Sequence, residues 1–164
     1  MTYDELLTEM EEKDCRIHEM RFQSAAKGLC IDKDVFLNKN IDSSAERKCV
    51  LAEELGHIMT TYGNILDRSR PENQKQEMQA RGYAYDLLIG FDGLLLAYSK
   101  HCRSIDEFVD FLDVTKQFFK DALEYYRQKY GSGTIYKGYA IMFEPCLNIL
   151  PAAEMKSVLA GHIS

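Results

Sequence analysis

The segment Val50-Leu51-Ala52-Glu53-Glu54-Leu55-Gly56-His57 decides how this chain is interpreted. Residues four apart lie on one face of an α-helix, so Glu53 and His57 point in the same direction and Glu54 lies one step round. Carboxylate and imidazole groups are the usual oxygen and nitrogen ligands of zinc in proteins. The segment therefore predicts a helix with a metal-binding face.

This segment differs by one residue from the standard motif His-Glu-x-x-His, in which two histidines hold zinc and the intervening glutamate is the general base. Here the first position is Glu53. A carboxylate is an accepted zinc ligand, so the difference does not by itself abolish binding. A second carboxylate offsets more of the charge of the ion, which predicts a weaker Lewis acid and tolerance of other divalent metals.

A third ligand is expected from a neighbouring helix, and Glu77 is the best candidate. It shares a helix face with Ala80 and Ala84, and small residues there permit close contact between helices. A glutamate near the start of a helix is also favoured by the helix dipole without any metal. Spacing alone leaves both interpretations of Glu77 open.

Local patterns before the motif predict one helix and one β-hairpin. Apolar residues recur at helical spacing over residues 3–13, with Thr2 placed as the N-cap. Two β-prone runs, 28–31 and 35–38, are separated by Asp32-Lys33-Asp34, which suggests a tight turn. This is the only region that the sequence clearly predicts as β.

The remaining chain is predicted to be helical. A capping pattern at Ser43 starts the motif helix, which should run to about Gly63, and a further helix should begin near Gln74. A second capping pattern at Ser104 opens a pair of helices that ends near Gly131. No strong signal follows after residue 131. Because several helices are predicted beside a single β-hairpin, the sequence predicts a mostly helical α+β fold.

Composition indicates a soluble protein that acts inside the cell. The 164 residues suit one compact unit, and the net charge of −6 argues against general attraction to nucleic acid. Neither a signal peptide nor an apolar run long enough to span a membrane is apparent. The cysteines are five in number and lack a Cys-x-x-Cys pair, which suits free thiols in the cytoplasm.

Taken together, four segments resemble the ImmA/IrrE family of metallopeptidases in their order and spacing. They are residues 28–32, 35–38, 50–57 and 77–80. The resemblance covers roughly residues 15–90, and residues 108–131 resemble the helical extension of members from mobile elements. It implies a zincin-like peptidase core over residues 1–100, with a helical extension and tail over residues 101–164.

The resemblance also implies a function and assigns roles to residues. It implies zinc bound by Glu53, His57 and Glu77, with Glu54 as the general base. The expected substrate is a repressor-type regulatory protein of a phage or another mobile element. The strand around residues 35–38 is a candidate edge for pairing with an extended substrate segment.

Two other functions stay open. A catalytically weak or inactive peptidase fold could act by binding a partner protein, because the first motif histidine is Glu53. The helix pair over residues 104–130 has the outline of a helix-turn-helix, so DNA binding is the other alternative. Its mixture of lysines, arginines and acidic residues is more typical of a solvated or protein-binding face.

Several further residues are interpreted as structural. Cys49 is too far along the helix from His57 to share an ion with it, and it is predicted to be a buried apolar residue. Tyr62 is predicted to pack at the helix end. The remaining histidines stand in no motif and are predicted to lie at the surface or in satisfied positions: His18, His101 and His162.

Overall fold

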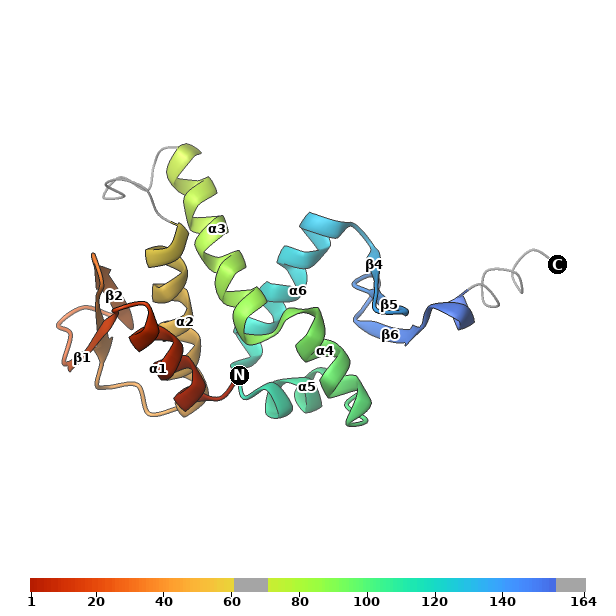
Figure 1. Ribbon diagram of the computed structural model, residues 1–164, viewed down its shortest axis with the longest axis horizontal. Helices are drawn as coiled ribbons and strands as arrows, with labels where there is room; N and C mark the ends of the chain where they lie inside the picture. The colour runs from red at the N-terminus through yellow and green to blue at the C-terminus, as the bar shows by residue number, and fades with distance from the viewer. Residues whose placement is uncertain (61–70, 156–164) are drawn as a thin grey trace.

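A computed structural model describes residues 1–60 and 71–155, except for the side chains of residues 71–73 (Figure 1). The described helices are α1 (Tyr3–Glu12), α2 (Ser44–Thr60), α3 (Pro71–Leu88), α4 (Gly90–Ser99), α5 (Ile105–Leu112) and α6 (Lys116–Tyr130). The described strands are β1 (Arg16–Met20), β2 (Gly28–Ile31), β3 (Asp34–Asn38), β4 (Gly133–Tyr136), β5 (Tyr139–Met142) and β6 (Asn148–Pro151). The predicted mostly helical α+β fold is confirmed.

The N-terminal helix forms as its local sequence predicts. Thr2 and Glu5 make a reciprocal capping box, in which each side chain accepts from the backbone N–H of the other residue. The apolar face of α1 buries Leu6 and Met10 completely. The helix therefore lies with one side on the core formed with α2 (Figure 1).

The first sheet has the strand order β1-β3-β2. The predicted hairpin is confirmed, because β2 pairs with β3 in antiparallel register. β1 adds to the other side of β3 in parallel register, and the sequence did not indicate it. The interpretation of residues 35–38 as an edge is wrong, since β3 is the central strand and β2 lies at an edge.

The motif helix α2 lies directly beside α3 (Figure 1). It starts as predicted, with the Ser43 hydroxyl accepting from the backbone N–H of Glu46. Its predicted end near Gly63 falls outside the described residues. α3 begins at Pro71 rather than near Gln74, because proline is well tolerated in the first turn of a helix.

The C-terminal part combines the predicted helix pair with a second sheet. Ser104 makes a capping box at the start of α5, and the Thr115 hydroxyl caps α6. The second sheet has the order β4-β5-β6, so the prediction of a single β region is wrong. The rings of Phe91, Tyr126 and Phe143 pack together between the helices and this sheet.

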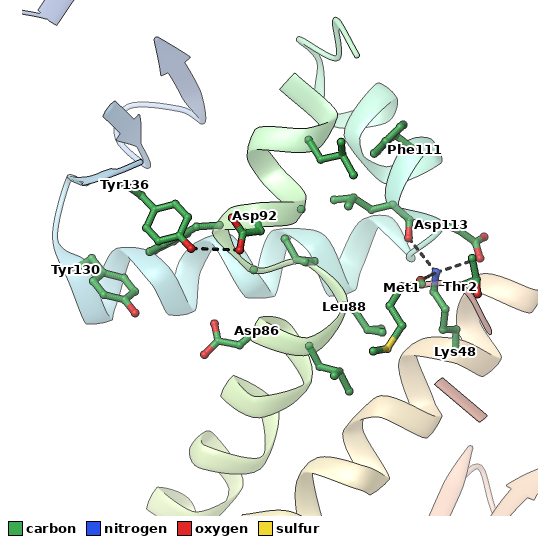
Figure 2. Close-up of a pocket in the computed structure, with 17 residues that line it drawn as sticks. Met1, Thr2, Lys48, Asp86, Leu88, Asp92, Phe111, Asp113, Tyr130 and Tyr136 are labelled. Atoms are coloured by element: carbon green, nitrogen blue, oxygen red, sulfur yellow. Dashed lines mark hydrogen bonds and ion pairs between the residues drawn. The ribbon is translucent and has the colours of Figure 1, made fainter. Parts of the chain in front are cut away.

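A cavity of about 730 Å³ lies near the chain start and the α3–α4 junction, away from the motif (Figure 2). At one end of it Lys48 of α2 is almost completely buried. Its ammonium group donates to the carbonyl oxygens of Met1 and Leu112 and pairs with Asp113. Lys48 thus joins the chain start and the end of α5 to α2.

None of the helices that the structure describes is long and apolar enough to cross a membrane.

Candidate metal centre

The predicted site residues come from two helices that pack unusually closely. Glu53, Glu54 and His57 lie on α2, and Glu77 lies near the start of α3. The helices approach each other at Gly56, where a Cβ atom would overlap the backbone of Ala80. Only glycine permits this spacing, and it brings the motif face of α2 against the first turns of α3.

His57 and Glu77 face each other across the two helices. The His57 Nε2 atom lies 3.5 Å from Glu77 Oε2. Two ligands of one tetrahedral zinc ion, each bound at about 2.0 to 2.1 Å, stand roughly 3.3 Å apart. The separation of this pair therefore matches the separation that a shared ion requires.

Arg81 holds the other oxygen of the Glu77 carboxylate. Its Nε atom donates to Glu77 Oε1 at 2.9 Å, one helical turn along α3. One carboxylate oxygen thus faces an arginine while the other faces His57. Arg81 was not among the residues predicted for the site, although its position four residues after Glu77 is the spacing at which an ion pair forms on a helix.

Glu53 lies in the electrostatic field of the same groups. Burial raises the pKa of the Glu53 carboxyl, the charge of Arg81 lowers it, and the charge of Glu77 raises it. Both charges come from α3, the helix that packs against α2. Its position one turn before His57 places it on the predicted face of α2.

The donor chemistry suits a divalent metal, but the full ligand set is not assembled in this conformation. Two carboxylates and one imidazole are ligands that zinc accepts. Among residues 1–60 and the described side chains from residue 74 on, no group of three or more histidine, cysteine, aspartate or glutamate side chains is arranged to hold a metal ion. The structure brings His57 and Glu77 together, and the role of Glu53, His57 and Glu77 as metal ligands stays a prediction.

Glu54 faces the first sheet rather than α3. A Cβ atom at Gly28 of β2 would lie 2.7 Å from Glu54 Oε1 and 2.6 Å from a methyl carbon of Val50. Burial, together with the neighbouring Glu54 carboxylate, raises the pKa of the Cys30 thiol to about 12. The predicted general base is thus in contact with β2, the edge strand.

The residues interpreted as structural behave accordingly where the structure describes them. Cys49 is buried, and burial raises the pKa of its thiol to about 11. His18 is exposed, and its ring stacks on Phe36. Its Nε2 atom lies 2.7 Å from Asp34 Oδ1. Tyr62 and His162 lie outside the described residues. All five cysteines are free thiols, as predicted.

Comparisons with known proteins identify the family. The sequence model of the peptidase M78 family, described as an IrrE N-terminal-like domain, matches residues 10–124, which is more than half of the chain. Searches of curated proteins and of solved structures gave no significant match. The matched region includes β1 to β3, both helices of the candidate centre and the start of the C-terminal part. The chain therefore belongs to the IrrE N-terminal-like family of M78 peptidases.

Proposed function

We propose that this protein is a zinc-dependent endopeptidase of the cytoplasm that cuts a repressor-type regulatory protein of a phage or another mobile element. The observation that carries the proposal is the meeting of His57 and Glu77 at 3.5 Å, with Glu54 on the adjoining face of α2. The family supports a peptidase. The dependence on zinc and the repressor as substrate go beyond what the family supports and are part of the proposal.

Each predicted residue has a distinct task in this proposal. Glu53, His57 and Glu77 would hold the ion, which supplies Lewis-acid polarisation of the peptide carbonyl when bound. Glu54 accepts the proton of the attacking water and passes it to the leaving amine. The reaction needs no covalent intermediate with the protein.

The outer edge of β2 is the position where we propose that the substrate backbone binds. In the part of the chain that the structure describes, β2 pairs with a strand on one side only, and its Gly28 contacts the Glu54 side chain. An extended segment of a protein substrate that pairs with this edge would lie beside the general base. β2 therefore suits substrate pairing better than β3 does, because it is both the edge strand and the strand in contact with Glu54.

The decisive experiment compares the wild type with Glu54→Gln. Both purified proteins are loaded with zinc and incubated with a proteome-derived peptide library, and the products are identified by mass spectrometry. We expect cleavage by the wild type that stops on addition of EDTA and is absent from the variant. Equal product formation by Glu54→Gln would rule out the assigned general base.

Partner binding without turnover is the second candidate function. It is favoured by Glu53 at the first motif position and by a ligand set that is not assembled among the described residues. Glu53→His restores the two-histidine motif, so a large gain in both zinc affinity and cleavage would indicate a weakened native enzyme. Failure of the wild type to bind zinc in excess would favour partner binding.

DNA binding through α5 and α6 has less support. Three of the cations on α6 pair with carboxylates. Lys116 Nζ lies 2.6 Å from Asp106 Oδ1, Arg127 Nη2 lies 2.5 Å from Glu124 Oε1, and Lys129 Nζ lies 3.8 Å from Asp86 Oδ2. The carboxylates among these cations lower the local positive potential, which weakens general attraction to a phosphate backbone. A gel-shift series at low salt tests this alternative, and salt-sensitive binding would revive it.

A further inference from the structure

The register of the β2–β3 hairpin fixes which backbone groups of β2 point away from β3. Directly before β2, the backbone N–H of Asn38 donates to the carbonyl oxygen of Lys27 at 2.9 Å. Since Gly28 lies opposite Leu37, Lys27 is the residue opposite Asn38, and these two form a hydrogen-bonded pair. Hydrogen-bonded and non-hydrogen-bonded pairs alternate along an antiparallel ladder.

This alternation determines which residues of β2 have unused backbone groups. Leu29 and Ile31 exchange hydrogen bonds with β3, whereas the backbone groups of Gly28 and Cys30 point to the outer side of the sheet. Among the described residues no strand lies on that side. Gly28 and Cys30 therefore each present a donor and an acceptor there, and an extended chain can satisfy both.

The side chains of β2 alternate in exposure along the same edge. Leu29 and Ile31 are 51% and 56% exposed, whereas Gly28 and Cys30 are less exposed. Gly28 lies against the Glu54 side chain of α2, so Leu29 and Ile31 are on the sheet face that points away from α2. The edge thus carries two branched apolar side chains, and β2 itself contains no charged residue.

These two side chains restrict the segment that can pair with the edge. Residues opposite each other in paired strands place their side chains on the same face, so the residues opposite Leu29 and Ile31 contact them. Apolar side chains there would bury the exposed apolar surface. The carboxylate of Asp34, opposite Ile31 on β3, is already bonded by Arg16 and His18, so it offers little to a cation on the segment.

We propose that the outer edge of β2 selects extended protein segments with apolar side chains at two alternating positions, those opposite Leu29 and Ile31. Leu29 and Ile31 are then specificity-determining residues of the substrate site, and neither takes part in the reaction. The role of this edge in cleavage rests on the proposed function, whereas its preference among bound segments does not.

The first arm of the test is amide hydrogen exchange measured by NMR in EDTA, where no metal takes part. In the free protein the amides of Gly28 and Cys30 should exchange faster than those of Leu29 and Ile31. A synthetic peptide in which valine and serine alternate should slow exchange at Gly28 and Cys30. Absence of this protection would overturn the proposal.

A second peptide controls for composition. It contains the same residues with the valines in adjacent pairs, so that no two valines stand two positions apart. Fluorescence anisotropy should show that the alternating peptide binds roughly three- to tenfold more tightly than the paired peptide, because two cross-strand apolar contacts are gained. Equal affinity for the two peptides would overturn the preference.

Substitutions assign the preference to particular side chains. The double variant Leu29→Thr/Ile31→Thr keeps a high β propensity but removes much of the apolar surface, so it should bind both peptides equally. Met20→Thr is the matched control, because Met20 is 46% exposed but lies on β1, the other edge strand. It should keep the preference of the wild type. A preference that survives in the double variant would overturn the assignment to Leu29 and Ile31.

Cleavage products separate this specificity from the proposed function. Peptides cut by the zinc-loaded wild type should carry apolar residues two positions apart, and cleavage without that pattern would overturn the specificity alone. If no peptide is cut but the alternating peptide still protects Gly28 and Cys30, the proposed function fails and the preference stands. Protection that rises with protein concentration in the absence of peptide would assign the edge to a second copy and overturn the proposal.

Discussion

Gly56 of α2 lies against the backbone carbonyl group of Ala80 in α3, and a Cβ atom at position 56 would stand 2.9 Å from the carbonyl carbon. No flexible side chain can move aside at this contact. Gly56→Ala should therefore push the helices apart and cost about 1 to 3 kcal/mol of stability. Thermal unfolding measures this as a fall in melting temperature of roughly 2 to 4 °C per kcal/mol.

The control for this substitution is Gly93→Ala in α4. A Cβ atom there meets only the end of the Leu112 side chain, at 3.3 Å. Alanine is the better helix former, so this variant should be as stable as the wild type or slightly more stable. If Gly56→Ala proves equally harmless, the close approach of α2 and α3 is not required.

Gly28→Ala should impair catalysis if the proposed function is right. The added methyl group would meet the Glu54 carboxylate and displace it from its position beside β2. A general base misplaced by about 1 Å can cost up to a hundredfold in rate. Cleavage kinetics of the zinc-loaded variant should show a lower kcat, and retention of full kcat would contradict this placement of Glu54.

Lys48→Met tests the buried ammonium group that joins three segments. Methionine fills a similar volume but leaves the Leu112 carbonyl, 2.9 Å from Nζ, without its donor. We expect a loss of about 1 to 3 kcal/mol, because a buried acceptor is left unsatisfied. Denaturant unfolding measures it, with Lys120→Met on the exposed side of α6 as the control. Equal stability of the two variants would show that Lys48 is dispensable.

Asp34 makes the stability of the first sheet depend on pH. The Arg16 guanidinium and then the His18 ring hold the pKa of the Asp34 carboxyl well below its usual range. A lowered folded pKa means that the carboxylate stabilises the fold above its unfolded pKa of about 3.9, and that this contribution is lost as the pH falls below that value. The difference in stability between the wild type and Asp34→Asn should therefore shrink below about pH 4.

Urea unfolding at several pH values measures this difference. Asp110→Asn, which removes an exposed carboxylate from α5, is the control for the change in net charge. A gap between the wild type and Asp34→Asn that widens on acidification would contradict the assignment to Asp34.

Local sequence signals predicted the elements that depend on local interactions. The capping boxes at Thr2 and Ser104 and the turn between β2 and β3 involve residues close in sequence, so their patterns are readable without the fold. β1 was missed because its residues are mostly exposed and its parallel pairing with β3 is non-local. The second sheet was missed because its four-residue strands are too short for a clear alternation.

The candidate centre also combines features that local sequence patterns predict with features that only the folded structure shows. Helical periodicity places Glu53, Glu54 and His57 on one helix, and the small-residue face of the next helix makes Glu77 the candidate third ligand, to which the resemblance then assigns a role. Contacts between elements required the structure, including His57 against Glu77 and Gly28 against Glu54. The sequence did not indicate β1, and pairing with β1 makes β3 the central strand of the first sheet. The prediction that β3 lies at the edge was therefore wrong.

β2 has no strand partner on its outer side among the described residues, and a free sheet edge is a position at which copies of a protein can pair. Its Leu29 and Ile31 side chains are 51% and 56% exposed, so a second copy that paired along this edge could also bury apolar surface. Lys27 and Lys33 stand at the two ends of the strand, where Lys27 pairs with Glu46 at 2.5 Å and Lys33 pairs with Asp14 at 3.2 Å. A second copy aligned along this edge would have to dehydrate both ion pairs, so the charged side chains at the strand ends disfavour growth of the sheet between copies.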